Sequence, residues 1–270
     1  MVRLNSKGEV VHNAKFSRTI LDTMNEILAE ELARFDDDVD VYVLDPMAGV
    51  GGIMEIADNH PQTIVTMIEI EEEWADVARL KAIPPDRVIH TDFLKWAESQ
   101  EPMEWDVVIT SPTYGNRMAD SHTPGPDDHS TRNTYRHVLG RPLTKGSSAG
   151  MQWGEEYRDF HTVAWSAVYD LLAPTGIFVL NVKDHIRGGV KQPVCMWHKN
   201  LCIARGFQLH CYYEVPVKGN RQGQNGQVRV DNEMVYVFRK PAMDLSKAAT
   251  KWTQPRFRGM QKGEARGAVK

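Results

Sequence analysis

Long apolar runs are missing from this 270-residue sequence. It has no stretch of 18 apolar residues, so we expect no membrane-spanning helix. The first residues, MVRLNSKGEVVHNAKF, lack the apolar core of a secretory signal, and we expect no such signal. Cysteine is scarce: Cys195, Cys202 and Cys211 are odd in number and lack CxxC spacing. This favours reduced thiols in the cytoplasm and argues against a disulfide framework or a zinc site.

Positive charge is scarce in the first part of the chain. Residues 1–116 carry nine Lys and Arg against 23 Asp and Glu, a formal charge of −14, whereas residues 117–270 carry 23 against 13, a charge of +10. The overall charge of −4 hides this asymmetry. A chain divided in this way can present one positive face to phosphate groups, which favours a nucleic-acid partner. The alternative is ordinary surface charge with a basic, solubilising tail.

Strand-like and helix-like segments alternate along the chain. Short β-branched runs predict strands over 41–46, 63–70, 87–93, 105–111, 177–184, 207–217 and 233–240. Helical spacing of apolar residues predicts helices over 17–34, 71–83, 161–173 and 193–206. The alternation favours an α/β fold with a doubly wound, mostly parallel seven-stranded sheet. Only a loop separates the final two strands, which suits an antiparallel pair.

A glycine-rich turn, DPMAGVGG at 45–52, follows the first predicted strand. Gly49 and Gly51 allow a tight turn and a close approach of the backbone to a ligand, although a generic strand–helix turn has the same composition. The sequence has no GK[ST] phosphate loop, and GVGGIM lacks the last glycine or alanine of a dinucleotide-binding G-x-G-x-x-G. These absences argue against a ligand that is held by its pyrophosphate.

Two further strand ends carry acids. Glu69 ends the second strand, where a carboxylate can accept both hydroxyls of a ribose; the alternative is a solvated acid beside Glu71. Asp92 follows the third strand and could take the exocyclic amine of an adenine, with Phe93 beside it; the alternative is a helix N-cap. Together with the turn, they suit an adenosine without a pyrophosphate, namely S-adenosylmethionine.

The fourth strand ends in TSPTYG, residues 110–115, on the same edge of the predicted sheet. Here the sequence resembles the amino-methyltransferases of the S-adenosylmethionine-dependent superfamily. Their signature is (Asp/Asn/Ser)-Pro-Pro-(Tyr/Phe/Trp), preceded by a DPxxGxG-type loop. The resemblance covers roughly residues 12–240 and includes HNAKFS at 12–17, which looks like the segment over the methionine end of the cofactor. It looks most like the compact DNA methylases encoded by bacteriophages and actinobacteria.

The resemblance implies a Rossmann-like class I methyltransferase fold, S-adenosylmethionine as the cofactor, and no metal. It also implies a cytoplasmic location, that of the host for a phage protein. The residues that it implies in cofactor binding are Lys15, Phe16, Asp45, Pro46, Ala48, Gly49, Gly51, Glu69, Asp92 and Phe93. Those that it implies in catalysis are Ser111, Pro112 and Tyr114.

The implied catalytic residues suit methylation of an exocyclic amine, whose lone pair is delocalised into the base. Ser111 Oγ and the Pro112 carbonyl would accept its two N–H bonds and draw the nitrogen towards tetrahedral geometry, while proline's fixed φ holds that carbonyl in place. Tyr114 would stack on a base that has left the duplex. The methyl group would move by in-line displacement, helped chiefly by positioning. Neither a metal nor a covalent enzyme intermediate is required.

Two features bear on this interpretation. Thr113 stands where the signature has its second proline; it adds an N–H and is expected to loosen the turn, but the acceptor carbonyl belongs to Pro112, so we expect activity to survive. Methylation at cytosine C5 is disfavoured because no cysteine lies near Ser111. Cys195, in PVC, falls in a later predicted helix and is expected in the core. A β-turn with Tyr114 in the core is the alternative for the motif.

We expect a single domain over 1–240, in which the weakly periodic insertion 117–156 forms a lid that faces the target, and a basic flexible tail over 241–270. Basic and histidine side chains of the insertion and later loops suit contacts with phosphates and bases. A disordered polar lid and satisfied polar loops are the alternatives. The residues predicted to bind nucleic acid are Arg117, Arg132, Arg136, Lys183, His185, Arg187, Lys218, Arg221 and Arg229.

These observations predict an S-adenosylmethionine-dependent DNA methyltransferase that acts on cytosine N4 or adenine N6, with duplex DNA as the favoured partner. One alternative is an RNA methyltransferase, for instance one acting on guanine N2. A protein-glutamine methyltransferase is another, but Ser111 argues against the Asn-Pro-Pro-Tyr motif that it uses. An alternative of a different class is a non-catalytic module that binds cofactor and nucleic acid, for which Thr113 is the clue.

Overall fold

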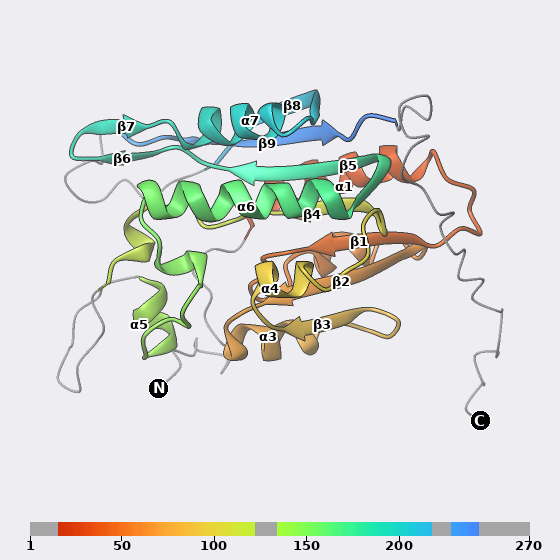
Figure 1. The fold of residues 1–270 in the computed structure, drawn as a ribbon, viewed down its shortest axis with the longest axis horizontal. Coiled ribbons are helices and arrows are strands. Elements are labelled where there is room, and N and C mark those ends of the chain that lie inside the picture. Colours follow the sequence, from red (N-terminus) through yellow and green to blue (C-terminus); the bar gives the residue numbers. More distant parts are fainter. Residues whose placement is uncertain (1–15, 122–133, 218–227, 243–270) are drawn as a thin grey trace.

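The computed structural model describes residues 16–121, 134–217 and 228–242 (Figure 1). Four residues predicted to be in the site, Lys15, Arg132, Lys218 and Arg221, lie outside these ranges, as does all of the predicted tail beyond residue 242; the side chain of Arg117 is likewise not described. In the described ranges, no helix has the length and apolar character needed to cross a bilayer.

One seven-stranded sheet forms the centre of the molecule, with strand order β3-β2-β1-β4-β5-β9-β8. Strands β1 to β5 are parallel to one another, which confirms the predicted doubly wound arrangement. The order reverses at β1, because the chain runs outwards to β3 and then returns to β4. The five strands are β1 (Val41–Asp45), β2 (Thr63–Glu69), β3 (Arg87–His90), β4 (Trp105–Thr110) and β5 (Leu172–Val182).

The last two strands of the sheet, β8 (Gln208–Pro216) and β9 (Asn232–Arg239), pair antiparallel as predicted. β9 lies between β5 and β8 and is antiparallel to both. A small hairpin of β6 (His185–Arg187) and β7 (Val190–Gln192) corrects the sequence prediction, which placed a loop directly after β5. Its three-residue strands are too short to produce a recognisable alternation of apolar residues.

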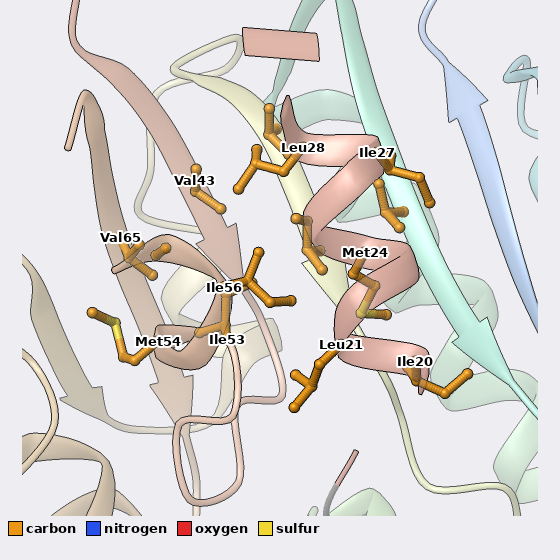
Figure 2. Close-up of a cluster of buried hydrophobic side chains, with 14 of the residues drawn as sticks. Ile20, Leu21, Met24, Ile27, Leu28, Val43, Ile53, Met54, Ile56 and Val65 are labelled. Carbon is orange, nitrogen blue, oxygen red and sulfur yellow. The ribbon is translucent and has the colours of Figure 1, made fainter. Parts of the chain in front are cut away.

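Helix α1 (Arg18–Leu32) covers one face of the sheet together with α2 (Met54–Ala57) and α3 (Glu72–Arg79). Ser17 caps α1, because its Oγ accepts a hydrogen bond from the Ile20 amide (3.3 Å). Val43 and Val65 of the sheet belong to the same core as the apolar stripe of α1, and Figure 2 shows this cluster closing between α1, α2 and the sheet. The predicted stripe is confirmed, since it is entirely buried: Ile20, Met24, Ile27, Leu28 and Leu32.

The opposite face is covered by α4 (Phe93–Ala97), α6 (Glu155–Leu171) and α7 (Val194–Ala204). α6 begins at Glu155, six residues before the apolar run at His161, and Tyr157 extends its buried stripe into the first turn. Tyr157 and Trp165 are fully buried in the core. Cys195 is also buried as predicted, and all three cysteines are free thiols.

The carboxyl ends of the parallel strands point towards the side of the molecule that carries α5 (Tyr135–Leu139) and the β6–β7 hairpin (Figure 1). The segment between β4 and α6 contains two short 3-10 turns, η1 (Arg117–Ala119) and η2 (Ser148–Gly150), besides α5. In parallel sheets, this edge is where ligands bind, next to the strand at which the order reverses. The fold therefore directs attention to the ends of β1, β2 and β4.

Candidate active site

A cavity of about 990 Å³ lies at this edge of the sheet. Its wall contains the ends of β1 and β2, the start of α4, the turn after β4 and the residues after β5. Such a volume is at the upper end of the range for small-molecule sites, roughly 300–1,000 Å³. The residues predicted from the sequence that line it are Phe16, Asp45, Pro46, Ala48, Gly49, Glu69, Asp92, Phe93, Ser111, Pro112, Tyr114, Lys183, His185, Arg187 and Arg229.

The turn after β1 is fastened to both neighbouring strands. Asp45 Oδ1 accepts hydrogen bonds from Thr110 Oγ1 (2.8 Å) and from the Met47 amide (3.1 Å), which ties the turn to β4. Gly49 has a φ of 54°, a left-handed conformation that favours glycine. Its amide donates to Glu69 Oε2 (2.7 Å), which ties the turn to β2. The backbone is thus fixed where it lines the cavity.

Gly51, which was predicted to contact the cofactor, does not line the cavity. It has a φ of 69°, and a Cβ placed on it would lie 3.0 Å from the Ala78 side chain. Its role is therefore close packing of the turn against α3. Gly52 lines the cavity instead, and a Cβ there would lie 2.7 Å from the ring of Phe16, so the ring rests on its bare backbone.

The two predicted ligand acids differ in their surroundings. Glu69 is buried, and burial raises the pKa of its carboxyl to about 7 even though the Glu71 amide (2.8 Å) and the Gly49 amide donate to it. Asp92 is the N-cap of α4, since its Oδ1 accepts from the Leu94 amide (2.9 Å). The N-cap alternative therefore holds for one oxygen, while Asp92 also lines the cavity.

The turn after β4 carries a connected set of polar groups. Ser111 Oγ and the Tyr114 hydroxyl lie 3.0 Å apart, and the Tyr114 hydroxyl donates to Glu233 Oε2 on β9 (2.9 Å). Asn181 on β5 directs Nδ2 at Ser111 Oγ (3.2 Å), the Tyr114 hydroxyl (3.0 Å) and Glu233 Oε2 (2.9 Å). Lys183 pairs with the other Glu233 oxygen at 3.6 Å. Because its hydroxyl is buried in this set, the pKa of Tyr114 is raised.

Thr113, which departs from the usual motif, is held on two sides instead of loosening the turn. Its Oγ1 donates to the Ser148 carbonyl (2.9 Å), and its own carbonyl accepts from the Tyr157 hydroxyl (2.7 Å). Gly115 follows with a φ of 62°, and its carbonyl accepts the Trp153 amide at 2.7 Å. The expected loosening is therefore wrong, because Ser148 of the insertion and Tyr157 of α6 supply the partners.

We expect Thr113→Val to lower the free energy of unfolding by about 1 kcal/mol, because it keeps the shape of threonine and removes the donor to Ser148. Thr113→Ser, which keeps the hydroxyl, is the matched control and should stay close to the wild type. Thr113→Pro restores the usual motif but loses the same bond. Urea unfolding measures all three; equal stability of the Val and Ser variants would contradict the assigned role.

After α5, residues 141–149 form a strap that passes over the ends of β2 and β4 and runs into η2. Arg141 binds both Glu71 and Glu73, and the Glu71 carboxylate also accepts from the amide (2.9 Å) and hydroxyl (3.0 Å) of Thr144. Glu71 is fully buried, so these donors compensate for the loss of its hydration. The end of the strap, residues 146–149, lines the cavity.

We expect Arg141→Ala to lower the free energy of unfolding by about 1–2 kcal/mol, because it leaves the buried Glu71 carboxylate without a cation. The arginine side chain is 33% exposed, so solvent screening keeps the loss below that of a fully buried pair. Arg79→Ala breaks an exposed ion pair with Asp76 and is the control, with an expected change below about 0.5 kcal/mol. Urea unfolding of both variants measures these losses of stability. Equal losses would contradict the role of Arg141 in anchoring the strap to Glu71.

Most of the described residues predicted to bind nucleic acid line the cavity, and Arg136 is the exception. Arg136 on α5 does not line the cavity, and its Nε is buried without a partner among the described residues. Lys183, Arg187 and Arg229 do line it. Both ring nitrogens of His185 are buried without a described partner, and burial lowers its pKa, so it is a neutral polar group and not a cation for phosphates.

Asn181 and Glu233 were missed by the sequence analysis. Asn181 is a polar residue inside the apolar run IFVLNVKD, and it is 1% exposed. That position alone is a usable signal, since a buried strand accepts an amide only where it finds partners. Glu233 had no such signal, because an acid at the start of EMVYVFRK resembles any solvated strand end.

No model of a protein family matches the sequence, and no curated protein matches it. Solved structures do match. CurJ carbon methyltransferase aligns with a TM-score of 0.50 and 14% identity, over 84% of this chain and 56% of that one. A Listeria monocytogenes protein described as a putative class I S-adenosylmethionine-dependent methyltransferase aligns with a TM-score of 0.52 and 14% identity. The alignment covers 88% of this chain and 65% of that one. This chain thus spans less than two thirds of either.

The [4+2]-cyclase SpnF aligns with a TM-score of 0.51 and 13% identity, over 87% of this chain and 86% of that one. Identities this low show a common fold, and the presence of a cyclase among the matches shows that the fold does not select the reaction. The sheet order and the antiparallel β9 agree with this likeness. The chain has the Rossmann-like fold of the class I methyltransferases.

Proposed function

We propose that this protein is an S-adenosylmethionine-dependent DNA methyltransferase, which transfers a methyl group to cytosine N4 or adenine N6 of a base turned out of the duplex. One observation carries the proposal. Ser111, Pro112 and Tyr114 open onto the same cavity as the turn at Asp45–Gly49 and the Glu69 carboxylate. An adenosine site and an amine-binding motif therefore face one cavity, as transfer between two ligands requires.

The residues at the β1 and β2 ends fit this cofactor. Glu69 keeps free lone pairs for the ribose hydroxyls beside its two backbone contacts, and Asp92 and Phe93 line the wall where an adenine would lie. Phe16 closes the end near Gly52. S-adenosylmethionine supplies a methyl group activated by a sulfonium. The protein's part is to hold the amine in line with that methyl group and to exclude water.

The target side has both acceptors and cations. Ser111 Oγ and the Pro112 carbonyl accept the amine hydrogens, and the Tyr114 ring offers a surface for the base. Lys183, Arg187 and Arg229 line the same cavity and suit phosphates that flank an extruded nucleotide. The strap of residues 141–149 serves as a cover over the cofactor side, as part of the proposed lid.

The test is transfer of tritiated methyl groups from S-adenosylmethionine to unmethylated duplex DNA, compared with total RNA. Label in DNA, with nucleoside analysis naming the base, supports the proposal. Label in RNA alone assigns an RNA methyltransferase instead. Cofactor binding without transfer to either polymer would point to the non-catalytic module. The variant Tyr114→Ala should abolish label in DNA while leaving binding of the cofactor measurable.

A further inference from the structure

Glu233 lies at the centre of the polar set behind the catalytic turn, although it is 119 residues away from Tyr114 in the chain. Its side chain is 17% exposed. One carboxylate oxygen accepts hydrogen bonds from the Tyr114 hydroxyl and from Asn181 Nδ2, each at 2.9 Å. The other oxygen lies 3.6 Å from Lys183 Nζ. An ion pair with Lys183 alone would need neither of the other two contacts.

The carboxylate fixes the direction of two hydroxyl groups. An ionised carboxylate only accepts hydrogen bonds, so the Tyr114 hydroxyl proton is committed to Glu233. The Tyr114 oxygen then accepts, and Ser111, 3.0 Å away, is the donor to it. Asn181 Nδ2, 3.2 Å away, donates to one lone pair of Ser111 Oγ, and the second lone pair remains free to accept a hydrogen bond. Ser111 is thereby held as an acceptor, which is the role that the amine requires.

We propose that Glu233 is a positioning residue of the methyl transfer: through Tyr114 it turns Ser111 into an acceptor for the target amine and takes up the proton that the methylated amine releases. This inference rests on the proposed function. It gives a functional role to a residue of β9, a strand that lies outside the sequence motifs at the other strand ends.

The proton balance closes without another reactant. The amine nitrogen gains the methyl group as the carbon–sulfur bond of the sulfonium breaks, and the nitrogen is left with one proton too many. That proton moves to Ser111 Oγ while the Ser111 hydroxyl proton moves to Tyr114 and the Tyr114 proton moves to Glu233. Both hydroxyls end neutral, the carboxylate becomes a carboxylic acid, and Lys183 stays charged beside it. Release of the proton to solvent restores the starting state.

The test measures kcat and cofactor affinity for Glu233→Gln, Tyr114→Phe and the double variant. Each single change breaks the same chain while keeping side-chain shape, so we expect a loss of about 10- to 100-fold in kcat. The double variant should lose no more kcat than the worse single variant, because all three variants break the same chain of hydrogen bonds. Cofactor affinity, measured by calorimetry, should stay within about twofold of the wild type in all three.

Two controls separate this role from a structural one. Glu214→Gln removes an equal charge from exposed β8 and should leave kcat unchanged. Glu233→Asp keeps a carboxylate and should recover part of the lost kcat.

Three outcomes are decisive. Loss of kcat in both single variants, no further loss in the double variant, and partial recovery in Glu233→Asp support the inference. A Glu233→Gln enzyme with wild-type kcat overturns it, while DNA methylation by the wild type keeps the proposed function intact. Should the wild type transfer no label to DNA or RNA, the proposed function fails, and this inference fails with it.

Discussion

Ser111→Ala is expected to lower kcat for methyl transfer to DNA by about 10²- to 10³-fold, the usual cost of removing one preorganised hydrogen-bonding group from an active site. In the proposed mechanism, the hydroxyl is the side-chain acceptor for the target amine, and Tyr114 and Asn181 set its direction. Alanine removes it and leaves the Pro112 carbonyl in place, so the cofactor side is unaffected. Binding of S-adenosylmethionine should therefore change by less than about twofold.

The measurement is single-turnover transfer of tritiated methyl groups, with calorimetry for cofactor binding. Ser166→Ala is the matched control, because it removes a hydroxyl that bonds only to the Thr162 carbonyl of its own helix, α6. Its kcat should equal that of the wild type. Ser111→Ala with undiminished kcat would remove the hydroxyl from the mechanism and weaken the proposed function with it.

Asp45→Asn is expected to raise the free energy of unfolding at pH 7.5 by about 2–4 kcal/mol. Burial raises the pKa of the Asp45 carboxyl to about 7, so the folded state favours the protonated form. The stability that this carboxyl contributes is fully present below pH 4 and is lost as the pH rises from about 4 to 7. Asparagine removes the charge, and its Oδ1 can accept from both Thr110 and Met47, which bond the same oxygen of Asp45.

The two proteins should converge at low pH. At pH 4.5 the wild-type carboxyl is already protonated in the folded state, so we expect the difference to fall to about 1 kcal/mol or less. Comparing variants at the same pH cancels the contributions of Glu69, whose pKa burial also raises, and of Glu73, whose pKa Arg141 lowers. Asp38→Asn, at an exposed position, is the control. If Asp45→Asn were less stable than the wild type at pH 7.5, interactions other than its two hydrogen bonds would have to stabilise the buried charge.

The fold was predictable because its signals are local and repeated. β-branched runs and the α1 stripe of Ile20, Met24, Ile27 and Leu28 each fix an element, and their alternation leaves few topologies for the sheet. The β6–β7 hairpin escaped prediction for the opposite reason. Its strands are short and so carry no period that a window of residues can detect.

The candidate site was predictable where the chain supplies it at successive strand ends. The turn at 45–49, Glu69, Asp92 and Ser111–Tyr114 line one cavity because parallel strands bring their carboxyl ends to one edge. Gly51 and Arg136 were predicted in the site but do not line the cavity. Spacing along the sequence does not show which way a residue faces. Thr113 was misjudged because its partner, the Ser148 carbonyl, is 35 residues further along the chain.

The sequence by itself determined the alternating α/β fold, the edge of the sheet that holds the candidate site, and the order along the chain of the strand ends that line it. These follow from hydrophobic periodicity and from residues adjacent to strands, and both are local in the chain. Only the tertiary structure decided what surrounds the motif. It brings Glu233 from β9 and Asn181 from β5 to Ser111, and it fastens the strap to Glu71. Such contacts depend on strand order and side-chain direction, which the packing of the whole domain sets.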